Sequence, residues 1–222
     1  MFDAHAHLEA PPPAGPVSGW VVPGVDPRRD AGWRGVRLGS EPAAGLAADP
    51  RIALALGLHP WHLPVDLDAA LGELRSLAAL RRPVAIGETG LDRGRRGGPI
   101  AAQHTAFRFQ VRLASELGLP LILHVVRSHG ACRAVLAAEG FTGGGMVHDF
   151  GGPREELDRW LGAGFHLSAS PRGLDRPEVL AAIPPERLLV ETDDAGPEAL
   201  PALVDALAAI RGEAAAGLAA RC

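Results

Sequence analysis

Short apolar runs alternate with amphipathic segments along most of the chain. The apolar runs are rich in aliphatic and β-branched residues and end at glycine, proline or polar residues, which is typical of strands. We expect eight strands, at residues 2–8, 20–25, 52–58, 84–88, 119–125, 146–150, 165–169 and 188–193. Helical spacing of apolar residues predicts helices at residues 66–80, 100–117, 128–139, 153–162, 176–183 and 198–211.

Strand–helix alternation of this kind predicts βα units and a parallel sheet. Eight units favour a compact, distorted (β/α)8 TIM barrel, although the 222 residues are fewer than the ~250 typical of that fold. A doubly wound open sheet is the alternative. Residues 26–49 fit the pattern least, and residues 35–39 could form an extra strand. We expect a single domain over residues 1–222, with a frayed helix after Gly212.

Composition narrows the range of functions. All 22 basic residues are arginine, which excludes Schiff-base and Walker-type lysine chemistry. The net charge of −4 gives no sign of the basic surface that many nucleic-acid-binding proteins have. Two distant cysteines, Cys132 and Cys222, and the lack of an 18-residue apolar stretch predict a reduced, cytoplasmic protein without membrane association.

Metal-competent side chains gather at the ends of the predicted strands, where a (β/α)8 barrel carries its functional residues. They are Asp3, His5, His7, His59, Glu88, Asp92, His124, His148, Asp149, Glu191 and Asp193. Because side chains alternate along a strand, His5 and His7 share one face, on which Asp3 could orient an imidazole. By the same alternation, Glu191 faces the same way as Asp193 and could support the site.

Each of these residues alone has an ordinary structural role. A His-x-His pair or a core histidine occurs in many proteins without a metal, and Asp193 could cap a helix. Their joint occurrence is different, because buried charges and imidazoles are costly unless they are paired or bound to a metal. One shared metal site accounts for all of them. Its mixed nitrogen and oxygen ligands suit Zn, Mn, Fe or Ni better than Mg.

Six segments resemble, in their order and spacing, the motifs of the TatD family of metal-dependent deoxyribonucleases. They are MFDAHAHL, GLHPWH, VAIGETGLD, LPLILHVVRSHG, GMVHDFGG and LLVETDD, and they cover residues 1–194. The resemblance implies a hydrolase of ester bonds on a distorted TIM barrel with two divalent ions, Mg, Mn or Zn. It also implies a DNA substrate that metal-activated water cleaves from the 3′ ends of single strands.

The resemblance further implies a role for each matching residue. Six residues would bind the metals: His5, His7 and Asp193 the first ion, His124 and His148 the second, and Glu88 both. Asp193 would also accept the proton of the attacking water, and His59 would contact a substrate phosphate beside the metals. Two cations held in this way can polarise a phosphoryl oxygen and stabilise the leaving oxygen.

The substrate contacts are a separate prediction. Arg127, three residues past a predicted ligand, is a candidate for phosphate binding, since guanidinium groups bind phosphate well. Arg93, Arg95 and Arg96 follow the fourth strand and could bind phosphate or form a solvated loop. Trp61 could stack on a base or plug the end of the barrel.

Departures from the family pattern keep other functions open. Asp149 adds a carboxylate beside His148 within the family's HCFSG-like segment, and Val126 stands where the family often has arginine. Related barrels hydrolyse small esters, lactones, amides and phosphoesters with similar ligands, and the acidic charge balance and short late loops favour that alternative. A metal-stabilised, non-catalytic scaffold would be expected to lack a ligand, and none is missing here.

Overall fold

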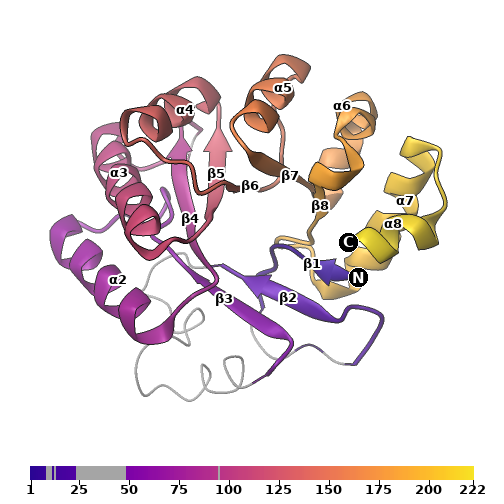
Figure 1. The fold of residues 1–222 in the computed structure, drawn as a ribbon, viewed down its shortest axis with the longest axis horizontal. Coiled ribbons are helices and arrows are strands. Elements are labelled where there is room, and N and C mark those ends of the chain that lie inside the picture. Colours follow the sequence, from indigo (N-terminus) through magenta and orange to yellow (C-terminus); the bar gives the residue numbers. More distant parts are fainter. Residues whose placement is uncertain (9–11, 13, 24–48, 95) are drawn as a thin grey trace.

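The computed structural model describes residues 1–8, 12, 14–23, 49–94 and 96–222. Its centre is an eight-stranded parallel sheet whose strands follow one another in chain order, with helices around it (Figure 1). The strands are β1 (Phe2–Asp3), β2 (Gly19–Val22), β3 (Ile52–Leu56), β4 (Ala85–Asp92), β5 (Leu121–Val126), β6 (Gly145–Val147), β7 (Phe165–Ala169) and β8 (Leu188–Val190). This topology confirms the predicted TIM barrel.

Backbone hydrogen bonds join the first and last strands. The Ala4 N–H donates to the Val190 carbonyl at 2.9 Å, and the Asp193 N–H donates to the His5 carbonyl at 3.0 Å. One step further, the His7 N–H donates to the Asp193 carbonyl at 3.2 Å. The barrel is therefore nearly closed, and the closure fixes the chain around His5 and His7 against the chain around Asp193.

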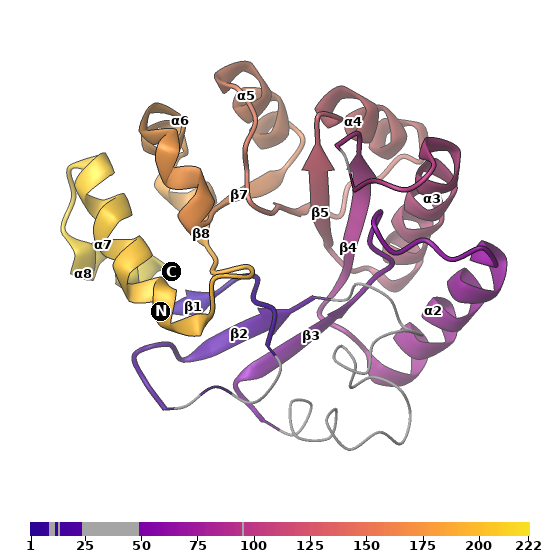
Figure 2. The same ribbon diagram turned by 180° about the vertical axis from the view of Figure 1, so that it is seen from behind.

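Helices cover the outside of the sheet (Figure 2). Those of the described chain are α2 (Leu67–Arg81), α3 (Ile100–Leu117), α4 (His129–Ala138), α5 (Arg154–Gly162), α6 (Pro177–Ala182), α7 (Leu200–Arg211) and α8 (Ala215–Arg221), with short 3-10 helices η2 (Pro171–Asp175), η3 (Pro185–Arg187) and η4 (Pro197–Ala199). Their apolar faces and the outward strand residues form one large core. Among the described residues, no helix has both the length and the apolar character needed to cross a membrane.

Several strands differ from the expected bounds at functional positions. β6 and β8 end at Val147 and Val190, so His148 and Asp193 follow these strands instead of lying within them. The strand expected at residues 2–8 is regular only over β1, because the Asp3 carboxylate accepts a hydrogen bond from the His5 N–H at 3.2 Å and forms a local turn. In contrast, β4 continues four residues past the expected end at Glu88. Asp92 therefore lies in the sheet rather than in a loop.

The possible extra strand at residues 35–39 lies outside the described residues.

The end of the chain differs from the prediction. The prediction of a frayed helix after Gly212 is wrong, because α8 is ordered against the core. Leu218 of α8 is 1% exposed and packs in the main core. The Cys222 carbonyl accepts a hydrogen bond from the Phe2 N–H at 2.6 Å, which ties the tail to β1.

The barrel interior is apolar toward the amino ends of the strands and polar toward the carboxyl ends. A small cluster fills the apolar part: Ala4, Ala55, Ala85, Ile122 and Met146. It borders a cavity of about 480 Å³. The buried histidines and carboxylates lie at the other end, as the barrel topology requires for a functional site.

Candidate metal centre

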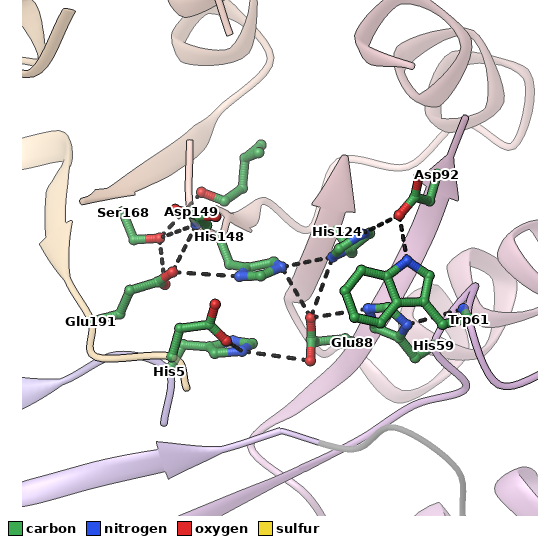
Figure 3. A network of polar contacts seen from close by, with 12 residues as sticks. His5, His59, Trp61, Glu88, Asp92, His124, His148, Asp149, Ser168 and Glu191 are labelled. Carbon is green, nitrogen blue, oxygen red and sulfur yellow. Dashed lines mark hydrogen bonds and ion pairs between the residues drawn. The ribbon is translucent and has the colours of Figure 1, made fainter. Parts of the chain in front are cut away.

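Glu88 of β4 lies at the centre of a cluster of imidazoles (Figure 3). Its side chain is only 3% exposed. The predicted residues that surround it come from the ends of other strands: His5, His7, His59, His124, His148 and Asp193. All of these are buried except His7, whose side chain is 29% exposed. The structure thus brings together the whole predicted set.

One oxygen of Glu88 faces the His-x-His pair. Oε1 lies 3.5 Å from Nε2 of His5 and 3.4 Å from Nε2 of His7. The same two nitrogens lie 3.7 and 3.3 Å from Oδ1 of Asp193. Ligand atoms of His5, His7 and Asp193 all lie within 4.8 Å of one another, a spacing that could hold one metal ion.

The other oxygen of Glu88 faces a second group of imidazoles. Oε2 lies 3.0 Å from Nε2 of His148, 3.4 Å from Nε2 of His59 and 3.7 Å from Nδ1 of His124. His59, Glu88 and His124 form a further set with the spacing of metal ligands, as do His5, Glu88 and His148. Glu88 therefore has the position that a bridging carboxylate needs. His59, expected to contact substrate, is as close to Glu88 as the expected ligands.

Two more carboxylates orient the second group. Asp92 Oδ2 lies 3.0 Å from Nε2 of His124, and Glu191 Oε1 lies 3.4 Å from Nδ1 of His148. The opposite nitrogen of His148 faces Glu88, whereas that of His124 lies 3.0 Å from Nε2 of His148 and 3.7 Å from Glu88 Oε2. A carboxylate behind a histidine is the usual support of a metal ligand. Glu191 supports the site as expected from its alternation with Asp193. The position of Asp92 at a strand end is as predicted, but its contact with His124 is not part of the sequence pattern.

Asp3 has a different role from the one expected. Its Oδ2 accepts a hydrogen bond from the Thr192 hydroxyl at 2.7 Å, and its Oδ1 accepts from the backbone N–H groups of Thr192, at 3.1 Å, and His5. Asp3 thus holds the backbone of the first and last strand segments together rather than an imidazole ring.

Two buried glutamines of α3 hold the backbone beside the site, and neither is among the predicted site residues. Gln110 accepts from the Leu58 N–H at 2.8 Å and donates to the Leu58 carbonyl at 3.1 Å. Gln103 does the same for Asp92, at 2.7 and 3.0 Å. Seven residues apart, they share one helix face. Polar residues recurring on an apolar helix face were the signal that could have revealed them.

Glycines of the GLHP and GETG segments allow the strands to approach closely. A Cβ on Gly57 would lie 2.5 Å from the backbone oxygen of Glu88. At Gly90, where φ is +140°, it would lie 2.1 Å from the backbone oxygen of His124. Real Cβ atoms do not make such contacts, so glycine is required at both positions beside the ligands.

The electrostatics of the cluster suit metal ligation. Burial would raise the pKa of Glu88, but His5, His148 and His59 hold that pKa well below its usual range. Burial lowers the pKa of His59 to about 4, and it also lowers the pKa of His5. His59 and His5 are therefore neutral at pH 7 and Glu88 is ionised, which are the protonation states that metal ligands need. Burial would lower the pKa of His148, but Glu88 and Glu191 raise it well above its usual value, so an ion bound there would displace a proton.

An unpaired imidazole tests whether the site fits a cation. Among the described residues, both ring nitrogens of His5 are buried and have no hydrogen-bond partner. An unsatisfied buried polar group is costly. A cation held by His5 Nε2, Glu88 Oε1 and Asp193 Oδ1 would give Nε2 the partner it lacks. The imidazole and carboxylate donors match ions such as Zn and Mn, so the residues present fit a metal centre.

The cluster borders a pocket of about 290 Å³, hereafter the ligand pocket. It is lined by His7, His59, Trp61, His62, Glu88, Arg96, His124, His148, Arg172, Asp193 and Asp194. This volume is at the lower end of the roughly 300–1,000 Å³ of small-ligand sites. The pocket has room for a small substrate or for one end of a polymer.

Of the arginines that line the ligand pocket, Arg96 was among the expected candidates and Arg172 was not. Arg93 and Arg127 are exposed and do not line it, and Arg95 lies outside the described residues. Of the described arginines, Arg96 and Arg172 line the pocket. Arg172 follows β7, far in sequence from any predicted ligand, so sequence proximity could not reveal it.

Trp61 lines the ligand pocket, but its ring is already engaged. Its Nε1 donates a hydrogen bond to Asp92 Oδ2. The Arg96 guanidinium lies 5.0 Å from the ring centroid, in a cation–π contact. These contacts favour Trp61 as a wall of the pocket and a support for Asp92 over a free platform for a base.

Comparison with known proteins identifies the family. The family model described as "TatD related DNase" matches residues 2–222. A relative from Pantoea vagans, named 3′-5′ ssDNA/RNA exonuclease TatD, is 35% identical over an alignment of 224 positions that covers 87% of this chain and 86% of the relative. A protein of the same name from Erwinia billingiae is 35% identical over an alignment of 189 positions that covers 75% of this chain and 72% of that one.

Solved structures agree with the sequence comparison. The crystal structure of YJJV, a TatD homologue from Escherichia coli, superposes with a TM-score of 0.83 and 26% identity, covering 100% of this chain and 94% of that one. A TatD-family hydrolase from Entamoeba histolytica has the same fold, with a TM-score of 0.84, 17% identity and the same coverage. Because the family model matches residues 2–222 and relatives of this family are 35% identical, the chain belongs to the TatD-related DNase family.

Proposed function

We propose that this chain is a metal-dependent exonuclease that removes nucleotides from the 3′ ends of single-stranded DNA or RNA. The activity is that of the named relatives, and the observation that carries it is Glu88. One oxygen of this buried carboxylate faces His5 and His7 and the other faces His124 and His148. Two divalent ions held there would polarise the phosphoryl oxygen, lower the pKa of water and stabilise the leaving oxygen.

Protein side chains would hold the ions, accept a proton and contact the substrate phosphate. His5, His7 and Asp193 hold one side of the centre, and Glu88 joins it to the other. Asp193 lines the ligand pocket, where a carboxylate oxygen can take the proton from the water that attacks phosphorus. His59, neutral at pH 7, also lines the pocket and contacts a phosphate oxygen.

The pocket supports a strand end as substrate. Its volume of about 290 Å³ admits a short part of a strand. With a net charge of −4 and two arginines of the described chain in the pocket, the protein depends on the metal ions for most of its attraction to phosphate. We expect Mg, Mn or Zn, and the histidine-rich ligands favour Mn or Zn.

Metal analysis and oligonucleotide digestion test the proposal together. We expect about two ions per chain, as in a two-metal site. We also expect release of nucleoside 5′-monophosphates from the 3′ end of a 5′-labelled single strand, and no release in EDTA. Glu88→Ala is expected to lose both the ions and the activity.

The control for contaminating nucleases is a set of variants purified identically. Asp193→Asn keeps the size of the side chain and is expected to lose activity while the protein stays folded by circular dichroism. Equal digestion by wild type and Asp193→Asn would point to a contaminant and contradict the proposal. Turnover of small esters or lactones with oligonucleotides left intact would replace it with a small-molecule hydrolase.

A further inference from the structure

Arg172, in η2 after β7, is ion-paired with Asp193 at the ligand pocket. Its NH2 group contacts Asp193 Oδ2, and its Nε lies 3.1 Å from Asp149 Oδ2. The Ser170 hydroxyl donates a hydrogen bond to the other oxygen of Asp149. The extra carboxylate beside His148 therefore anchors an arginine that no motif contains.

The contact gives the two oxygens of Asp193 different surroundings. Oδ1 faces Nε2 of His5 and His7, where a metal would be held. Oδ2 faces the Arg172 guanidinium. An oxygen that held an ion would not be free to take a proton, which would leave Oδ2 as the proton acceptor of Asp193. While Arg172 is paired with Oδ2, that oxygen is occupied.

We propose that Arg172 binds a substrate phosphate next to the scissile one, and that it leaves Asp193 Oδ2 when it does so. This inference rests on the proposed function. A phosphate is a strong competitor for the guanidinium because it accepts two parallel hydrogen bonds. The exchange frees Oδ2 when a strand is bound, so recognition of the flanking phosphate is coupled to proton transfer.

The position of Arg172 suits this role. Its side chain is 59% exposed, so incoming strand can reach it, while Asp149 fixes its Nε end. Arg96, the other arginine of the described pocket, stacks on Trp61. Arg172 contacts the ligand cluster through Asp193 Oδ2. Once it leaves that oxygen, its guanidinium can bind a phosphate next to the one that the ligands surround.

Two substrates separate phosphate recognition from positioning of Asp193. A single-stranded oligonucleotide has flanking phosphates, whereas bis(4-nitrophenyl) phosphate has only the scissile one. For Arg172→Ala we expect KM for the oligonucleotide to rise about tenfold or more, the usual size of a lost charge-assisted hydrogen bond, with turnover of the small diester undiminished. Arg172→Lys should recover part of the loss. Arg154→Ala replaces an arginine of similar exposure (60%) on α5 and is the matched control. It should change neither KM nor turnover for either substrate.

Binding gives a readout independent of turnover. The holoenzyme is titrated with a fluorescent oligonucleotide whose 3′ linkages are phosphorothioates, at several salt concentrations. One lost phosphate contact on a single strand lowers the slope of log K against log salt by about 0.7. An unchanged slope and KM for Arg172→Ala would overturn the inference, as would equal losses on both substrates, since Arg172 would then only position Asp193. A wild type that leaves cleavable oligonucleotide intact contradicts the proposed function instead, and the salt slope still tests Arg172.

Discussion

Replacing Gln110 by leucine should both destabilise the protein and disturb the candidate metal centre at His59. Gln110 is fully buried and pairs with both backbone groups of Leu58, the residue before His59. Leucine has similar size and suits a helix, so the substitution removes the hydrogen bonds with little loss of packing. The perturbation therefore isolates the link between α3 and the backbone that carries His59.

The magnitude follows from the groups left without partners. The Leu58 N–H and carbonyl would each lose a buried hydrogen bond, at about 1–3 kcal/mol per group. The extra apolar surface of leucine offsets on the order of 1 kcal/mol. We expect a net loss of about 3 kcal/mol. With an m-value of about 3 kcal/mol per M or less in urea, the midpoint falls by about 1 M or more.

Urea unfolding followed by circular dichroism measures the effect, and the digestion rate in native buffer measures its consequence at His59. Thr105→Leu, on the exposed face of the same helix, is the matched control and should leave both unchanged. A Gln110→Leu midpoint within about 0.2 M of wild type, or a large shift in Thr105→Leu as well, would refute the reasoning.

Three further outcomes are expected. Asp92→Asn should lower metal affinity about 10–100-fold by calorimetry, because His124 loses the carboxylate that orients it; unchanged affinity would show that Asp92 serves only Trp61. Gly90→Ala should cost about 4 kcal/mol or more in urea unfolding, since its Cβ would meet a backbone oxygen at 2.1 Å; Gly72→Ala on α2, with open space, should instead be neutral or stabilising. Cys132, which is fully buried and whose pKa burial raises to about 12, should react with a thiol reagent only after unfolding; rapid reaction in the native protein would contradict its packing.

The fold was predictable because its rules are local. Apolar runs bounded by glycine and polar residues located all eight strands, and their alternation with helices fixed the parallel topology. The errors came from contacts that a local pattern does not contain. The turn at Asp3 shortens β1, and the tail becomes ordered because Leu218 enters the core and Cys222 bonds to Phe2.

The ligand cluster was predictable for a similar reason. A residue at the carboxyl end of a barrel strand reaches one common mouth, so its place follows from its position in a strand. Glu88 and Asp193 meet there although they are far apart in sequence. Gln103 and Gln110 were missed because they form hydrogen bonds with backbone groups. Every residue has such groups, so the sequence does not show which backbone segment a glutamine will contact.

Substrate contacts follow no such rule, because they depend on the direction in which each loop leaves its strand. Arg127 stands three residues after His124 and yet does not line the ligand pocket, whereas Arg172 reaches it from a loop with no predicted ligand. What places Arg172 is a partner 23 residues away, Asp149, which the structure uses as a counter-charge. The unexpected carboxylate beside His148 and the unexpected arginine of the pocket are therefore partners in one ion pair. Asp149, which departs from the family pattern, thus holds an arginine of the ligand pocket, while every predicted metal ligand is present.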